Sequence, residues 1–119
     1  MTAILEEAVH NEATQRLDAK GVARLYDVPL GVVAKAIGTK EETLRRRSDS
    51  RSVQPGLAIL VDCFARVYEF MSSDEKAVRR WLNRPNRALD GMQPVALLEA
   101  GRLSDLKAIV TQMVTAGFA

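Results

Sequence analysis

Residues 57–71 read Leu-Ala-Ile-Leu-Val-Asp-Cys-Phe-Ala-Arg-Val-Tyr-Glu-Phe-Met and carry the most regular apolar pattern of the chain. Apolar side chains recur every three or four residues over about four turns, at positions Leu57, Leu60, Val61, Phe64, Tyr68 and Met71. This spacing places them on one face of a helix. We therefore predict a buried amphipathic helix at the centre of the fold.

Helical spacing also dominates the part of the chain before this segment. Apolar stripes, together with glycine and proline positions, predict helical segments at about residues 4–20, 22–26, 30–37 and 39–47. The polar residues 48–54 have no apolar period and predict a loop.

After the central segment, a capping box at residues 72–75 predicts the start of a helix that ends before Pro85. Pro94 suits the first turn of a further short helix. A last helix begins near residue 103, and its buried stripe is predicted to contain Leu103, Leu106, Val110, Met113 and Val114. No segment alternates as a strand would, so we predict an all-α fold.

Length and composition restrict the possible functions. A chain of 119 residues forms one compact domain or two small lobes that share a core. The predicted loop divides it into lobes at residues 1–53 and 54–119. Cys63 and His10 are the single residues of their types, which excludes an intramolecular disulfide and leaves few metal or catalytic sites. We expect no catalytic residue, no metal and no cofactor.

The sequence also indicates where the protein works. Its apolar runs are far shorter than the roughly 18 residues that cross a bilayer. The amino terminus reaches Glu6-Glu7 without the basic start and apolar middle of a signal peptide. We expect a cytoplasmic protein without membrane contact.

Residues 30–47 have the spacing of a helix-turn-helix. Gly38 is suited to end the first helix, and Thr39 with Glu42 forms a capping box for the second. If these two helices bind DNA, we expect the exposed basic side chains to contact phosphates and the threonines to contact base edges. The candidate DNA-binding residues are Thr39, Lys40, Thr43, Arg45, Arg46 and Arg51.

Other residues argue against DNA binding. Arg47 occupies a position where such motifs usually bury an aliphatic or aromatic side chain. It must therefore reach solvent, or the helix must end early. Glu41 and Glu42 suit the helix dipole but repel phosphate. Both alternatives, with and without DNA binding, remain open at this point.

Residues 81–94 predict a docking surface. A helix ends on the apolar Trp81-Leu82, turns at Pro85-Asn86, and restarts at Pro94. The stretch holds no His, Cys or Ser and only one carboxylate, Asp90, so we expect binding rather than catalysis here. Trp81 is more typical of a core than of an interface. Asn86 is expected to bond its own loop.

The residues Trp81-Leu82, Pro85-Asn86, Ala88-Leu89, Gly91, Pro94 and Leu97-Leu98 resemble the toxin-binding domain of the Xre/MbcA/ParS family of type II antitoxins. The resemblance covers about residues 55–119. The helix-turn-helix spacing at about residues 22–47 matches the Xre-like amino-terminal part of the same family.

This resemblance implies a partner that is a RES-domain toxin, an enzyme that degrades NAD or transfers its ADP-ribose. It implies that the last helix and tail of the antitoxin cover the toxin's nucleotide pocket. A homodimer within a hetero-oligomeric complex is expected as well, because repressors of this kind bind pseudo-palindromic sites with matching two-fold symmetry. If the helix-turn-helix binds operator DNA, the antitoxin also represses its own operon. The toxin-binding residues expected on this basis are Arg84, Asn86, Arg87, Met113, Thr115, Gly117, Phe118 and Ala119.

Two alternatives to an antitoxin can be compared with it. A stand-alone helix-turn-helix transcription regulator explains residues 22–51 but leaves the stretch at 81–94 without a purpose. A small enzyme needs a nucleophile or base with an orienting partner. The candidates His10 and Cys63 lie on separate segments without such neighbours.

Overall fold

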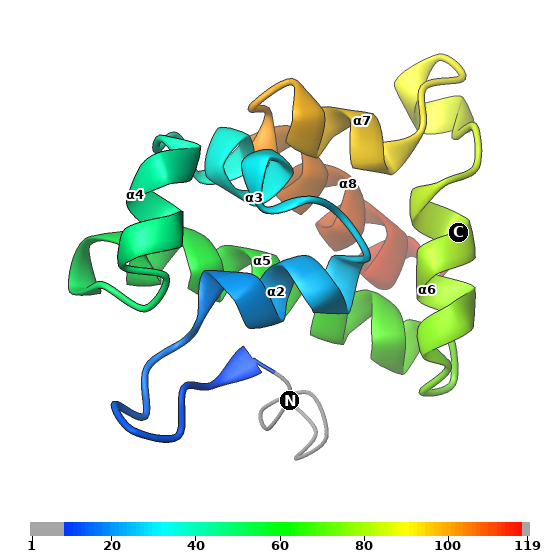
Figure 1. The fold of residues 1–119 in the computed structure, drawn as a ribbon. Coiled ribbons are helices and arrows are strands. Elements are labelled where there is room, and N and C mark those ends of the chain that lie inside the picture. Colours follow the sequence, from blue (N-terminus) through cyan, green and yellow to red (C-terminus); the bar gives the residue numbers. More distant parts are fainter. Residues whose placement is uncertain (1–8, 118–119) are drawn as a thin grey trace.

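Helix α5 (Gln54–Phe70) runs through the centre of the computed structural model, which describes residues 9–117 (Figure 1). The face predicted to be buried is buried: Leu57, Leu60, Val61 and Phe64 have at most 2% of their surface exposed. The hydroxyl of Tyr26 donates to the carbonyl oxygen of Leu60 at 2.7 Å, which joins the neighbouring helix to this spine. The prediction of a central amphipathic helix is confirmed.

The helices that precede α5 are α2 (Ala19–Tyr26), α3 (Leu30–Ile37), α4 (Glu41–Arg46) and the short 3-10 helix η1 (Arg51–Val53). Those that follow it are α6 (Glu75–Leu82), the 3-10 helix η2 (Arg87–Leu89), α7 (Pro94–Glu99) and α8 (Leu103–Ala116). Helices α2, α3, α6 and α8 pack against α5 (Figure 1). Between residues 9 and 117 the only β-structure is an isolated bridge from His10 to Leu17. The all-α prediction is confirmed.

Helices from both halves of the chain share one core. Helix α3 packs against α2 and α4 on one side and against α7 on another, and α5 packs along α8. The approach of α5 to α3 is close, since a Cβ on Gly56 would lie 2.7 Å from Cβ of Ile37. The buried apolar residues of residues 9–117 form one cluster. The boundary between residues 53 and 54 stays a prediction.

The predicted helix at residues 4–20 is wrong over residues 10–18, whereas Val9, Ala19 and Lys20 are helical. Residues 1–8 lie outside the described residues, and residues 10–18 form a loop closed by the His10–Leu17 bridge. The side-chain oxygen of Asn11 accepts from the backbone N–H of Ala13 at 2.8 Å, and that of Asp18 accepts from Lys20 at 2.8 Å. Such local bonds compete with a helix ladder, so α2 starts only after Asp18.

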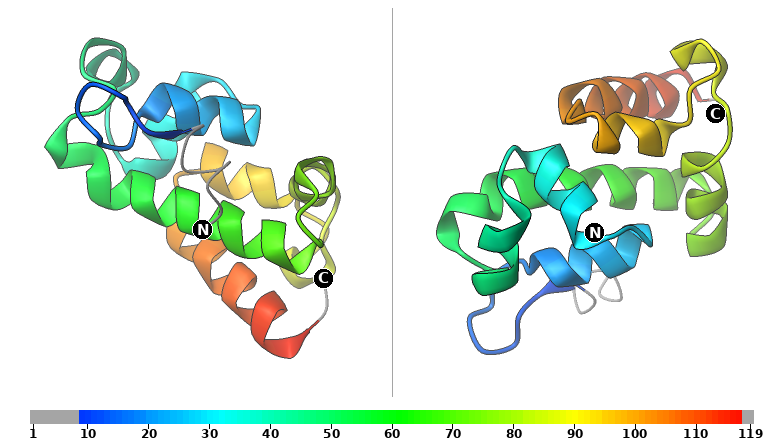
Figure 2. Two further views of the ribbon diagram at one scale, coloured as in Figure 1. Left: turned by 90° about the horizontal axis from the view of Figure 1, so that it is seen from below. Right: turned by 45° about the horizontal axis from the view of Figure 1, so that its top comes forward.

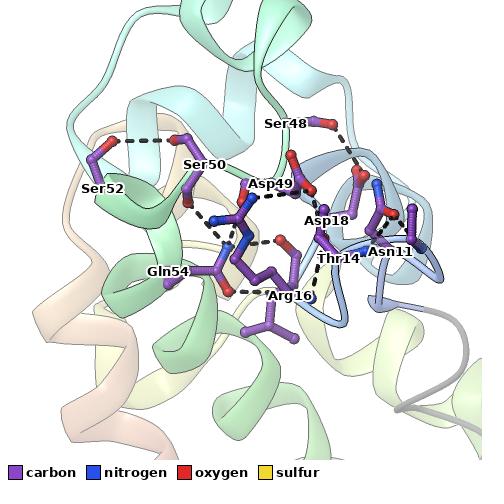
Figure 3. A network of polar contacts seen from close by, with 11 residues as sticks. Asn11, Thr14, Arg16, Asp18, Ser48, Asp49, Ser50, Ser52 and Gln54 are labelled. Carbon is purple, nitrogen blue, oxygen red and sulfur yellow. Dashed lines mark hydrogen bonds and ion pairs between the residues drawn. The ribbon is translucent and has the colours of Figure 1, made fainter.

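This loop is held against residues 48–54 by polar contacts (Figure 3). The side-chain amide of Gln54 accepts from the N–H of Leu17 at 2.9 Å and donates to the carbonyl oxygen of Leu17 at 2.8 Å. The hydroxyl of Thr14 donates to Asp49 at 2.6 Å, and that of Ser48 donates to Asp18 at 3.0 Å. The segment predicted as a loop at 48–54 therefore contains a 3-10 turn and ends in the first residue of α5.

We expect Gln54→Ala to lower the free energy of unfolding by about 1–3 kcal/mol, because the substitution leaves the partly buried N–H and C=O of Leu17 without this partner. Urea unfolding followed by circular dichroism measures the change. Ser52→Ala is the matched control, since the exposed hydroxyl of Ser52 is hydrogen-bonded only to the hydroxyl of Ser50 among the described residues. Equal stability of both variants would contradict a role for the Gln54 amide.

The predicted end of α3 is confirmed and the predicted start of α4 is wrong. Gly38 ends α3 in the left-handed region, with φ of 76°. The N–H of Thr39 then donates back to the carbonyl oxygen of Ala34 at 2.9 Å, so Thr39 completes the end of α3. Lys40 precedes the first residue of α4, and no side chain caps that helix. The Thr39–Glu42 capping box does not form.

Helix α8 differs from its predicted stripe at one position. Leu103, Leu106, Val110 and Met113 are buried, but Val114 is 39% exposed. Gly117 ends the helix in the left-handed region, with φ of 79°. Within residues 9–117 no helix is both long and apolar enough to cross a membrane.

Candidate functional site

The candidate site is built on α6, whose start and end are both fixed locally. The carboxylate of Asp74 accepts from the N–H groups of Lys76 and Ala77 at 3.0 and 3.3 Å, so Asp74 caps α6. The predicted capping box of Ser72 with Glu75 does not form, because α6 starts only at Glu75. Trp81 and Leu82 at the other end are buried. The prediction that Trp81 belongs to the core is confirmed, since its side chain is 8% exposed.

Residues 83–93, which we call the corner, fold into a loop that holds its own shape. The side-chain oxygen of Asn86 accepts from the N–H of Ala88 at 2.9 Å, as expected for a residue that bonds its own loop. The backbone of Asn86 also exchanges bonds with Met92 at 3.1 Å and Gly91 at 2.9 Å. The amide of Gln93 donates to the carbonyl oxygen of Asn83 at 2.9 Å. A loop closed in this way is ready to bind without further ordering.

The corner exposes two guanidinium groups. Arg84 and Arg87 are both exposed, and neither forms an ion pair within residues 9–117. Arg79 and Arg80 on α6 differ, because they contact Glu75 at 3.2 Å and Asp74 at 3.8 Å. Unpaired arginines can form two parallel hydrogen bonds with a carboxylate, which suits them to an interface.

The end of α8 lies at the same end of the molecule as the corner (Figures 1 and 2). Thr115 and Gly117 are exposed there. Phe118 and Ala119, also expected to bind the partner, lie outside the described residues. Met113 is different, because its side chain is only 4% exposed and packs in the core. The corner, with Arg84, Asn86 and Arg87, and the last turn of α8 thus lie toward the same end of the molecule.

Residues 66–112 match the family described as the antitoxin Xre/MbcA/ParS C-terminal toxin-binding domain. This part of the chain is similar to that toxin-binding domain. The matched residues take in the last turn of α5, then α6, the corner, α7 and most of α8. The resemblance to this antitoxin family is confirmed over residues 66–112. No curated protein matches the chain significantly.

The helices before the toxin-binding domain carry the second candidate surface. Helices α3 and α4 are joined by residues 38–40, and Leu44 of α4 is fully buried. The side chains of Lys40, Thr43, Arg45, Arg46 and Arg51 are exposed, and that of Thr39 is partly so. Arg45 forms an ion pair with Glu41 of its own helix. The figures place α4 far from the corner, at the other end of the molecule (Figure 1).

The structure decides how Arg47 is accommodated. Helix α4 ends at Arg46, and Arg47 follows as its exposed capping residue. The N–H of Arg47 donates to the carbonyl oxygen of Thr43 at 2.9 Å. Of the two expected outcomes, an Arg47 side chain that reaches solvent or a helix that ends early, the structure has the early end of α4. The exposed guanidinium of Arg47 therefore avoids the cost of burial.

Cys63 lies in the core that supports the toxin-binding domain. Its side chain is 2% exposed. The pKa of Cys63 is raised to about 11 by burial and by the charge of Asp62, against the opposing effects of Arg66 and Lys107. The thiol is therefore protonated at neutral pH, which is the state of a structural cysteine.

Sequence reasoning missed two features of the site. Val114 is the one exposed large apolar side chain within residues 9–117, and it precedes Thr115 in the chain. The apolar spacing predicted Val114 to be buried with the rest of the stripe, so its exposure could not be predicted from the sequence. Gln93 and Asn83, which brace the corner, carried only a weak signal, namely the preference of Asn for helix ends.

Proposed function

We propose that this chain is the antitoxin of a type II toxin–antitoxin pair and that its partner is a RES-domain toxin, which degrades NAD or transfers its ADP-ribose. The match of residues 66–112 to a toxin-binding domain carries this proposal. The rigid corner with its unpaired arginines supports it, because a preformed basic loop is suited to a protein partner.

In the proposed complex the antitoxin blocks the NAD site of the toxin sterically. The corner, through Arg84, Asn86 and Arg87, holds the toxin surface. The end of the chain, with the exposed Thr115 and Gly117 followed by Phe118 and Ala119, enters the nucleotide pocket. Met113 anchors the last turn of α8 from inside, since its side chain is buried. The antitoxin supplies no chemistry.

Co-expression tests this function. The toxin encoded next to this chain is induced in a host cell, alone or with the chain, while growth and cellular NAD are measured. We expect the chain to restore both growth and NAD, and the two proteins to co-purify. A neighbouring protein that stays toxic and does not co-purify would contradict the proposal.

Arg84→Glu combined with Arg87→Glu is expected to weaken toxin binding by roughly 100-fold, because buried charge contacts at interfaces are worth about 2–5 kcal/mol. Surface plasmon resonance measures the change, and the wild-type association rate should fall as salt rises. Arg102→Glu is the matched control, since Arg102 is exposed near the start of α8 and pairs with Asp105. An equal loss for the control would mean that overall charge, not the corner, matters.

We further propose that α3 and α4 act as a helix-turn-helix, through which a homodimer represses its own operon. The exposed Lys40, Arg45, Arg46 and Arg51 would contact phosphates, and Thr39 and Thr43 would lie nearer to base edges. These basic side chains also suit the second candidate function, a stand-alone transcription regulator. That alternative leaves the toxin-binding domain unexplained.

Replacing Arg45 and Arg46 together by Ala is expected to weaken operator binding about tenfold or more at moderate salt, and to reduce the salt dependence, because two phosphate contacts are lost. Electrophoretic shifts over a salt series measure both effects. Toxin neutralisation should be unchanged. A variant that loses both activities has lost its fold, which circular dichroism would reveal.

A further inference from the structure

The outer faces of α5 and α8 carry two shallow grooves, whose lining shares only Thr115 with the proposed toxin surface and no residue with the proposed DNA surface. The groove on α8 has a volume of about 550 Å³ and extends from Ser104 to Thr115. The groove on α5 has a volume of about 280 Å³ and extends from Ala58 to Glu69. They adjoin where Nη1 of Arg66 donates to Oγ1 of Thr111 at 3.1 Å. The two helices therefore present one continuous face, which we call the α5–α8 face.

The α5–α8 face has opposite charges on its two helices. Asp62 of α5 and Lys107 of α8 are exposed. Arg66 contacts Thr111 across the two helices, and Asp62 and Lys107 each lie four residues before one of these partners, so the two charges lie at a similar level along helices that run in the same direction. Within the described residues, Asp62 pairs only with Arg66, at 3.9 Å, and Lys107 forms no ion pair. The face thus has one carboxylate and one ammonium without a strong partner of opposite charge.

Two-fold symmetry would pair these charges. Helices α5 and α8 lie side by side and run in the same direction (Figure 2). A two-fold axis parallel to them would place α5 of one copy over α8 of the other. Because Asp62 and Lys107 lie at a similar level, each Asp62 would then face the Lys107 of the other copy, twice per dimer. Short side chains such as Ala58 and Ala108 would let the helices approach to about 8–10 Å.

We propose that the α5–α8 face is the surface through which two copies of this chain associate. The proposal assigns a surface to the homodimer of the proposed function and does not depend on the toxin. From Ser104 to Thr115 the face is about 16 Å long, and it is two helices wide. A face of this length and width has a smaller area than the roughly 800 Å² that each partner buries in a standard interface. We therefore expect a dimer with a Kd on the order of micromolar.

Sedimentation of the full chain over about 1–100 µM, a range that spans such a Kd, tests the proposal. We expect a mass that rises from 13.1 kDa toward twice that value. Asp62→Lys and Lys107→Asp should each weaken association roughly tenfold or more, because like charges then face each other. The double variant should recover the association of the wild type. Glu99→Lys is the control, since Glu99 is exposed on α7, away from this face.

The outcomes are separated by measuring folding and toxin neutralisation in the same variants. Circular dichroism should show unchanged folding, because both side chains are exposed. A wild-type chain that stays monomeric, or single variants that associate as strongly as the wild type, would overturn the proposal. Variants that still associate but fail to neutralise the toxin would assign the face to the toxin and overturn it as well. Charge-swap rescue in a chain that never neutralises a toxin would support this face and contradict only the antitoxin function.

Discussion

Deletion of residues 115–119 is expected to leave a folded chain that no longer neutralises its toxin. The described part of this segment, residues 115–117, is exposed, whereas the core residue Met113 is retained. Within the described residues the deletion therefore removes little buried surface, and we expect the free energy of unfolding to change by less than about 0.5 kcal/mol. Inhibition should fall at least about 30-fold, which corresponds to the loss of one hot-spot contact of about 2 kcal/mol.

Toxin inhibition and toxin binding are measured separately for this deletion. NAD turnover by the purified toxin is titrated with the full and the shortened chain, and binding is followed by calorimetry. The corner is intact in the shortened chain, so weakened binding that leaves the toxin active is the expected pattern. Glu99→Gln, an exposed change on α7, serves as the control. Complete inhibition by the shortened chain would assign the blocking role to other residues.

Trp81→Ala is expected to lower the free energy of unfolding by about 3–5 kcal/mol, since it removes a large buried ring and leaves a cavity. The ring lies in the core with Val78, Leu82 and Leu106. This loss is a large part of the roughly 5–15 kcal/mol that stabilises a typical domain. Urea unfolding followed by circular dichroism measures it. This probe is needed because Trp81 is the single tryptophan, so its fluorescence is lost with the substitution.

Trp81→Phe separates the ring from its N–H group. Nε1 of Trp81 is buried and has no hydrogen-bond partner within the described residues. A buried donor without a partner costs about 1–3 kcal/mol. Removing it therefore offsets part of the destabilisation that comes from the small cavity left by the Phe side chain. We expect Trp81→Phe to be destabilised by much less than Trp81→Ala. A Trp81→Ala variant that is as stable as the wild type but fails to bind the toxin would contradict a core role and assign Trp81 to the toxin interface.

The periodic parts of the fold could be predicted from the sequence because burial alone decides them. The stripe from Leu57 to Met71 places α5 correctly to within three residues at its start and one at its end. Gly38 ends α3 because only a residue tolerant of positive φ is favoured there. The fold class follows from such stripes, since nothing in the pattern competes with them.

The errors arise where distant side chains or competing local bonds decide the structure. Residues 10–18 have apolar spacing, but Gln54, 37 positions after Leu17, binds the backbone of Leu17 and fixes a loop. Thr39 has the sequence of a cap, yet its N–H already completes α3. In both cases the deciding contact is formed by tertiary structure or by the preceding helix, so a local pattern does not reveal it.

For the candidate site, the turn chemistry of Pro85-Asn86 predicted a corner, and its closed hydrogen bonding agrees with that prediction. Met113 was expected at the interface because it is near the end of the chain, whereas its place on the stripe buries it. The roles of Arg84 and Arg87 toward a partner stay predictions.

The position of α3 has a consequence for protein engineering. One side of this helix supports α4, and another rests on α7 of the toxin-binding domain. Gly101, with φ of 71°, also lies against it, since a Cβ there would come within 3.3 Å of the carbonyl oxygen of Lys35. A chimera that joins residues 1–53 to a foreign carboxy-terminal half would expose or misfit the side of α3 that rests on α7. Exchange of the exposed residues of α4 alone would leave that contact intact, so it is the safer route to altered specificity.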